Sequence, residues 1–528
     1  MSRQRESRRG LSRRQLLRAG LGASALAGGM APAFVRAAGN RGRTLPDTGS
    51  GVQIGDLRGD SAVIWSRTDR DARMRVRWST APDFSSIGGE HQLHTLQDTD
   101  HTGKVLISNL PAGSDIHYTV DFLDLADYRS RSESVQGSFR TPPEGDRDIR
   151  FLWSGDTVGQ GWGINPDIGG MPIYRRMAGL EPDFFIHSGD AIYADNPLSA
   201  RVELDDGQVW RNLVTEPKSR VAESLDDYRG QYRYNLMDEG LRDFYRNVPV
   251  IAQWDDHEVT NNWYWEMRKS EDPRYRESSV ARLAARAMRA FQEYTPTRRH
   301  PLDPERLYDR FPYGPALEVF RIDLRSYRGR NSNEQFTTLS PESRIIGAAQ
   351  LRWLKRALVE STATWKVIAS DMPLGVIIYD DWQTQRGAEG IALRDGPAAG
   401  RELEIADLLT HLRDNAVQNI VWLTADVHYT AAHYYDPARA AYRDFAPFWE
   451  FVSGPLNAGT FGGNTMDNTF GPQVVYQRGA PEGTANLSPL SGRQFFGQVD
   501  IAADTHAMTV TLRDTAGSNL FTQVLQPV

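Results

Sequence analysis

The chain has no cysteine in its 528 residues. Disulfides, thiolate nucleophiles and thiolate metal ligands are therefore excluded, and any metal must be held by oxygen or imidazole ligands. The sequence also has no G-x-S-x-G elbow, which argues against a serine hydrolase. It lacks a long hydrophobic run as well. The weakly apolar stretch from Ala19 to Val35 is interrupted by glycines and Pro32, and it is shorter than the roughly 20 apolar residues of a membrane span.

The N-terminal residues 1–37 are predicted to be a twin-arginine signal peptide. Arginines precede the segment Ser12-Arg13-Arg14-Gln15-Leu16-Leu17, the apolar stretch follows it, and Val35-Arg36-Ala37 provides a small-residue cleavage site. A membrane anchor is the alternative, but the glycines and the proline disfavour it. We therefore expect the twin-arginine export machinery as a partner, a periplasmic or secreted location, and no stable membrane anchor.

The balance of charge is acidic. The formal net charge is −7, and cleavage of residues 1–37 would remove eight arginines and one glutamate, leaving about −14. A chain with this charge is not expected to bind nucleic acid or an anionic membrane through bulk charge.

Two domains are predicted after the signal peptide. Residues 48–143 contain several short alternating strands separated by turns, a pattern typical of an immunoglobulin or fibronectin type III sandwich. In residues 148–528 strands and helical segments alternate, which indicates an α/β domain. The expected helices are residues 172–180, 278–294, 348–360 and 400–415. Residues 199–241 and 459–491 are polar and irregular, and we expect long loops there that act as lids or substrate walls.

Five short apolar runs in the second domain each lead into an aspartate. Runs of this length bounded by Gly, Ser or Asp predict buried strands. In layered α/β folds, ligands gather beyond the carboxyl ends of such strands, so five carboxylates at these ends predict a cation site. The runs begin near residues 149, 184, 248, 366 and 420, and the first aspartates after them are Asp156, Asp190, Asp255, Asp371 and Asp426.

Three short motifs add other ligand types to these aspartates. Gly189-Asp190-Ala191-Ile192-Tyr193 brings a carboxylate and a phenol close together, and a tyrosine ligand suits a hard trivalent metal such as iron. Asp255-Asp256-His257-Glu258 concentrates repelling charge that is costly to bury without a cation. Asp426-Val427-His428 projects a carboxylate and an imidazole from alternate positions. A surface acidic run and a core histidine are the non-functional alternatives for the last two.

In their order along the chain, these motifs resemble the calcineurin-like metallophosphatases. Ile186-His187-Ser188-Gly189-Asp190, Trp254-Asp255-Asp256-His257-Glu258 and Asp323-Leu324-Arg325-Ser326-Tyr327-Arg328 are similar to the alkaline phosphatase D, or PhoD-like, family within that superfamily. The resemblance runs from about residue 48 to the C-terminus. It implies a two-sheet metallophosphatase sandwich flanked by helices, preceded by an all-β immunoglobulin-like or fibronectin-III-like domain.

The resemblance also implies a role for each matching residue. Asp156, Asp190, Tyr193 and His428 match the ligands of an Fe³⁺ ion, with Asp190 bridging to a second metal. Asp256, Asp371 and Asp426 match the other ligands of that second metal. Carboxylates in place of imidazole and amide favour Ca²⁺ over zinc. No motif supports Asp371, which is chosen only because it follows a strand. Some family members are thought to use a cysteine ligand, which this chain lacks.

The expected reaction is hydrolysis of a phosphate monoester or diester by a metal-bound hydroxide, with His257 contacting the phosphate and protonating the leaving group. Asn262 and Trp162 are expected to bind substrate, although aromatic residues are more often part of a core. A phospholipase D-type phosphodiesterase, a phosphotriesterase and a nucleotidase remain alternatives on the same site. A non-catalytic calcium-stabilised surface protein is a further alternative, although it needs neither His257 nor His428.

Overall fold

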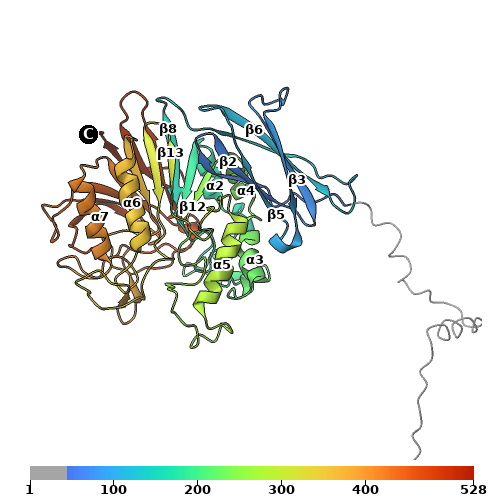
Figure 1. Ribbon diagram of the computed structural model, residues 1–528. Helices are drawn as coiled ribbons and strands as arrows, with labels where there is room; N and C mark the ends of the chain where they lie inside the picture. The colour runs from blue at the N-terminus through green and yellow to red at the C-terminus, as the bar shows by residue number, and fades with distance from the viewer. Residues whose placement is uncertain (1–43) are drawn as a thin grey trace, which may run out of the picture. The chain divides into compact units, whose positions relative to one another are not determined.

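The structure is a computed structural model that describes residues 44–528 (Figure 1). The predicted signal peptide, residues 1–37, therefore lies outside the described residues. Among the helices of the described part, none is long and apolar enough to cross a membrane. The residues from Leu45 to Val528 form one compact unit.

Two large sheets form the centre of this unit. The nine-stranded sheet has the order β24-β23-β22-β8-β9-β12-β1-β2-β5, and the seven-stranded sheet has the order β13-β14-β15-β18-β20-β19-β21. The strands of the first are β1 (Val52–Arg58), β2 (Ser61–Arg67), β5 (Thr102–Ile107), β8 (Ile149–Ser154), β9 (Phe184–His187), β12 (Val250–Ala252), β22 (Phe495–Ile501), β23 (Met508–Asp514) and β24 (Asn519–Leu525). Those of the second are β13 (Asp309–Tyr313), β14 (Leu317–Arg321), β15 (Trp365–Ala369), β18 (Ile420–Thr424), β19 (Thr430–Tyr435), β20 (Phe448–Val452) and β21 (Pro472–Arg478).

Each central strand is buried on both faces, which explains its continuous apolar sequence. Successive side chains of a strand point to opposite faces. In β8, Phe151 and Trp153 therefore join a core that also contains Val367 and Val421 of the other sheet, whereas Leu152 joins the core beneath the helices. All five apolar runs are strands, as predicted: β8, β9, β12, β15 and β18. The C-terminal residues form three further strands of the nine-stranded sheet, β22, β23 and β24.

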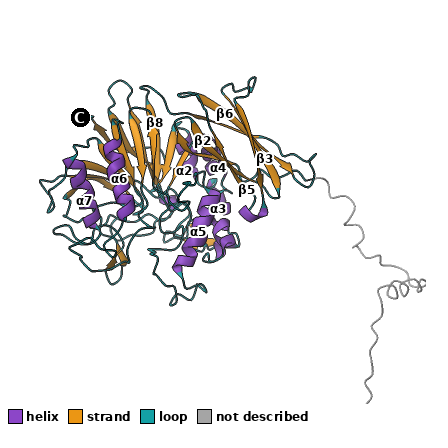
Figure 2. Cartoon of the chain, viewed as in Figure 1, coloured by secondary structure: helices purple, strands orange, loops and turns teal. Residues whose placement is uncertain are grey.

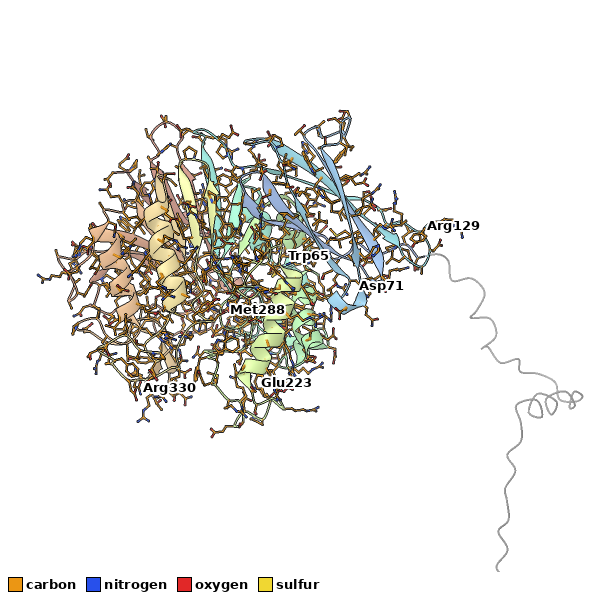
Figure 3. The ribbon with its side chains drawn as sticks, in the orientation of Figure 1. Trp65, Asp71, Arg129, Glu223, Met288 and Arg330 are labelled. Atoms are coloured by element: carbon orange, nitrogen blue, oxygen red, sulfur yellow. The ribbon has the colours of Figure 1, made fainter. Side chains whose placement is uncertain are left out.

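Helices cover the outer face of each sheet (Figure 2). On the nine-stranded sheet these are α2 (Pro172–Ala178), α3 (Leu225–Asn235), α4 (Glu239–Asn247) and α5 (Val280–Tyr294), and on the seven-stranded sheet α6 (Ala348–Glu360) and α7 (Glu402–Asp414). Met288 of α5 and Trp65 of β2, both labelled in Figure 3, belong to one core cluster. Trp65 Nε1 also donates to the Glu293 carbonyl at 2.7 Å. The predicted helix–sheet–sheet–helix sandwich is confirmed.

The N-terminal β region is shared between two sheets. β3 (Ala72–Ser79), β4 (Gly89–Thr95), β6 (Asp115–Asp124) and β7 (Val135–Arg140) form a sheet of their own in the order β4-β3-β6-β7. β1, β2 and β5 instead extend the nine-stranded sheet, because β1 pairs in parallel with β12 at Gly55 and Val250. The predicted β character is confirmed. The division into domains near residue 143 stays a prediction.

The prediction of an irregular loop over residues 199–241 was wrong, because α3 and the start of α4 lie there. The helix α3 has few aliphatic residues and buries tyrosines instead, including Tyr228 and Tyr232. Its start has a capping box in which Ser224 and Asp227 bond to each other's backbone N–H groups. Two short hairpins complete the fold: β10 (Arg201–Glu203) with β11 (Val209–Arg211), and β16 (Tyr379–Asp381) with β17 (Arg386–Ala388).

Candidate metal centre

The carboxyl ends of strands from both sheets supply the predicted ligands. β8, β9 and β12 are parallel neighbours, so the residues that follow them meet at one edge of the nine-stranded sheet. Asp156, Asp190 and Asp256 lie in these three connections. β18 of the facing sheet leads into Asp426 and His428.

Three groups of side chains in the described residues bring ligand atoms within 4.8 Å of one another. The first group combines the aspartates after β8 and β9 with the histidine after β18, and the other two share Asp256. The groups are Asp156, Asp190 and His428; Asp190, Asp256 and His257; and Asp255, Asp256 and Asp426. Because the groups overlap through Asp190 and Asp256, they form one continuous cluster.

Several of these residues have left-handed backbone conformations. The φ angles are 68° at Asp156, 50° at Asp190, 65° at Asp426 and 58° at His428. Residues other than glycine adopt this region rarely and at a cost, and such residues concentrate at functional sites. The strained turns lie just beyond the carboxyl ends of β8, β9 and β18, where these side chains come together.

Two glycines make room for the cluster. A Cβ atom on Gly454 would lie 2.1 Å from Asp156 Oδ2, and one on Gly159 would lie 2.5 Å from the Tyr193 ring. Neither position tolerates a side chain while these two residues keep their places.

His428 has the protonation state of a metal ligand. Its Nδ1 donates to the Gly459 carbonyl at 2.5 Å, and its Nε2 lies 2.8 Å from the Tyr193 hydroxyl. Burial lowers the pKa of His428 to about 4, so the imidazole is neutral at physiological pH. The phenol of Tyr193 and the Nε2 atom of His428 therefore lie close enough to bind one ion together.

Glu258 holds the connections after β9 and β12 in place. Its carboxylate accepts hydrogen bonds from the backbone N–H groups of Asp190 (3.1 Å), Ala191 (2.6 Å) and Asp255 (2.7 Å). Burial raises its pKa to about 7. Glu258 was identified from the sequence only as part of the acidic run, and the structure shows that it binds backbone.

His257 is oriented by a residue that the sequence analysis did not find. Its Nδ1 lies 2.6 Å from Oδ1 of Asp195, and Asn261 N–H donates to Oδ2 of Asp195 at 2.8 Å. The pair of His257 and Asp195 lies beside the cluster, because the backbone N–H of His257 also donates to Asp190 Oδ1 at 3.0 Å. Burial alone would lower the pKa of His257, but Asp195, Asp256 and Asp190 together raise it well above its usual value. The only indication of this role in the sequence is that Asp195 follows the predicted ligand Asp190 by five residues.

Arg325, in the connection after β14, was also missed as a site residue. It is completely buried and forms hydrogen-bonded ion pairs with Asp255 and Glu389. Its Nε lies 3.5 Å from Asp371 Oδ2, and its Nη2 lies 3.5 Å from Asp426 Oδ1. The guanidinium therefore occupies the inner end of the acidic cluster.

The remaining predicted residues lie at different depths. Asp371 is buried but belongs to none of the three ligand groups. Asn262 is half-buried and reaches the cluster through its backbone N–H, which donates to Asp256 Oδ2 at 2.5 Å. Trp162 is only 4% exposed, and its Nε1 donates to Asn486 Oδ1 at 2.9 Å.

The charges and orphan oxygens of the cluster fit bound cations. Burial raises the pKa of Asp156 and Asp190 well above the usual range, and that of Asp426 to about 8. Oδ2 of Asp156, Oδ2 of Asp255 and Oδ2 of Asp371 are buried and have no hydrogen-bond partner. Buried carboxylates of this kind are stable when paired with cations, and oxygen and imidazole donors suit hard metal ions.

Comparison with known proteins agrees with this geometry. A family model described as "PhoD-like phosphatase" matches residues 151–512, and a second, described as its N-terminal domain, matches residues 34–143. The chain belongs to the PhoD-like phosphatase family. The family resemblance inferred from the sequence motifs is therefore confirmed.

Individual relatives are more distant. The chain is 26% identical to alkaline phosphatase D of Bacillus subtilis (strain 168) over 411 residues, which is 72% of this chain and 64% of that protein. A solved structure titled "Structure of PhoD" matches with a TM-score of 0.66 and 18% identity over 92% of this chain and 90% of the other. The purple acid phosphatase PPD1 from yellow lupin (Lupinus luteus) seeds matches with a TM-score of 0.54 and 12% identity, over 91% and 74% of the chains. The two structural likenesses show a shared fold.

Proposed function

We propose that the protein is a metal-dependent phosphoesterase that hydrolyses phosphate monoesters, diesters or both. The observation that carries the proposal is the convergence of Asp156, Asp190, Asp256 and His428, from four strand ends in two sheets, on one buried cluster. Family membership and the 26% identity to an alkaline phosphatase D support the same reaction.

We assign Asp156, Asp190, Tyr193 and His428 to Fe³⁺, with Asp190 shared with Ca²⁺. The phenol and the neutral imidazole support iron at the first position, and the carboxylates of Asp190, Asp256 and Asp426 support calcium at the second. When bound, such a pair of ions would activate water and neutralise the charge of the phosphoryl group.

His257 is proposed as the acid that protonates the leaving oxygen. Its Nδ1 atom is occupied by Asp195, so Nε2 is the nitrogen left to face substrate. The buried carboxylate of Asp195 fixes the ring and favours its protonated form. The Tyr193 ring, 4.2 Å away between centroids, supports the other side of the imidazole.

Asn262 is proposed to form the substrate wall beside the second metal. Its side-chain amide donates to the carbonyl and to Oδ1 of Asp380 at 3.2 and 3.0 Å, which ties the β16–β17 hairpin to the cluster. The organic part of the substrate would then lie against this hairpin, where Tyr379 and Trp382 stack edge to face at 6.3 Å. Trp162 is too deeply buried to serve as a second wall without movement.

Hydrolysis of chromogenic esters tests the proposed reaction. The protein, purified with its metals, is expected to release p-nitrophenol from p-nitrophenyl phosphate or from bis-p-nitrophenyl phosphate. The Asp190→Asn variant, which removes the shared carboxylate, is expected to lose metal and activity together. The proposal would be contradicted if the metal-loaded wild-type protein cleaved neither of these esters and none of a panel of phospholipids, nucleotides and phosphotriesters.

We also propose export through the twin-arginine machinery, on the basis of residues 12–17. Replacement of Arg13 and Arg14 by lysine is expected to retain the protein, with its signal peptide uncleaved, inside the producing cell. Unchanged export of this variant would contradict the proposal.

A further inference from the structure

The inner end of the acidic cluster holds one arginine among four carboxylates. Arg325 is 0% exposed in its side chain, so it contacts neither solvent nor substrate. Its charge is surrounded by Asp255, Asp371, Asp426 and Glu389. Without a cation at this place, four carboxylates would face one another, three of them buried and Asp426 partly exposed, which is strongly unfavourable.

The position of Arg325 is fixed from two sides. Its own loop is held by Asp323, whose Oδ1 accepts the backbone N–H groups of Arg325 (3.0 Å) and Ser326 (2.9 Å). Glu389 holds the guanidinium from the other side and is itself bonded to Arg328 at 2.8 Å. Arg325 and its neighbouring arginines lower the pKa of Glu389 to about 2 against the effect of burial. The guanidinium of Arg325 is therefore held in one position at the inner end of the site.

The four carboxylates differ in whether they belong to one of the three ligand groups. Asp426 lies in a group with Asp255 and Asp256 whose oxygen atoms come within 4.8 Å of one another. Asp371 lies in no such group of the described residues, and its Oδ2, which has no hydrogen-bond partner, lies 3.5 Å from Arg325 Nε. The same arginine thus faces two carboxylates that belong to the metal cluster, Asp255 and Asp426, and two that do not, Asp371 and Glu389.

We propose that Arg325 is an internal cation of the metal centre and that Asp371, together with Asp255 and Glu389, is one of its counter-ions. The second metal is then held by Asp190, Asp256 and Asp426, and Asp371 is a positioning residue that acts through Arg325. The inference rests on the proposed two-metal site and revises the ligand set that the sequence predicted. A fixed positive charge at the inner end reduces the number of metal charges needed to balance the buried carboxylates.

A matched pair of variants tests the assignment. Asp371→Asn and Asp426→Asn make the same change, and both carboxylates lie 3.5 Å from Arg325. Iron and calcium are measured by elemental analysis of each folded, dialysed protein. Asp426→Asn is expected to lose about one divalent ion per chain, whereas Asp371→Asn keeps it and both keep iron. Loss of the same ion from both variants would overturn the assignment.

A double variant keeps the test decisive if Asp371→Asn does not fold. Arg325→Gln combined with Asp371→Asn removes both charges of the proposed pair and leaves neither one buried alone. The double variant is expected to fold better than Arg325→Gln and to retain the divalent ion. A double variant that folds but lacks this ion would assign Asp371 to the metal. A wild-type protein that binds no metal would overturn both this inference and the proposed function.

Discussion

Replacement of Asp195 by asparagine is expected to slow the reaction without removing the metals. Within the described residues, Asp195 is hydrogen-bonded to one member of the three ligand groups, His257, at 2.6 Å in a buried environment. Asparagine keeps an oxygen for Asn261 N–H but loses the charge that orients and protonates the imidazole. The change therefore acts on the proposed proton transfer alone.

The size of this effect follows from the lost hydrogen bond. A hydrogen bond to a charged group contributes about 1.5–3 kcal/mol. Since a tenfold change in rate corresponds to about 1.36 kcal/mol, kcat is expected to fall roughly 10- to 150-fold. KM should change little, because Asp195 does not face substrate.

The dependence on the leaving group distinguishes this role from a merely structural one. A general acid matters most when the departing oxygen is a poor leaving group. The Asp195→Asn variant should therefore lose more activity with phenyl phosphate than with p-nitrophenyl phosphate, and adding His257→Gln should cost little more because the two residues act together. Equal losses on both esters, or fully additive losses in the double variant, would refute the proposed role of the pair.

Further predictions concern packing, pH and the aromatic residues. Gly454→Ala places a Cβ 2.1 Å from Asp156 Oδ2 and should lower the iron content of the protein. The control variant Gly462→Ala, whose Cβ would contact nothing closer than 3.6 Å, should leave the iron content unchanged. Equal iron content in both variants would contradict the packing argument. Burial and Asp467 raise the pKa of Glu402 to about 8, so its contribution to stability is complete below pH ~4.5 and is lost as the pH rises through 8. Urea unfolding at several pH values should show this loss in the wild type and a flatter profile in Glu402→Gln, and identical profiles would contradict it. Trp162→Phe should lower the free energy of unfolding by about 1 kcal/mol through its bond to Asn486 while leaving KM unchanged, and a raised KM at unchanged stability would instead support a substrate contact.

The sequence was sufficient to predict the strands and the residues that follow them. The apolar runs that became β8, β9, β12, β15 and β18 are continuous because both faces of each strand are covered, and this pattern is local. The convergence of Asp156, Asp190 and Asp256 follows from the rule that neighbouring parallel strands present their carboxyl ends at one edge.

The partners of these residues could not be predicted in the same way. Asp195 and His257 are 62 positions apart, and Arg325 and Asp255 are 70 positions apart, so no local pattern joins them. The left-handed backbone conformations at Asp156 and Asp190 could not be predicted either, because an aspartate in a sequence does not indicate a positive φ. The helix α3 was missed because its buried face consists of tyrosines in place of the expected aliphatic residues, although the Ser224–Asp227 capping box was a readable signal.

The two-metal centre is the claim on which the account depends, and anomalous diffraction from crystals of the metal-loaded protein tests it most directly. Data collected on both sides of the iron absorption edge should locate iron beside Asp156, Tyr193 and His428. A second ion is expected about 3.5–4 Å away, with Asp190 between the two. Absence of iron from this position, or metal ions bound only at the protein surface, would contradict the account.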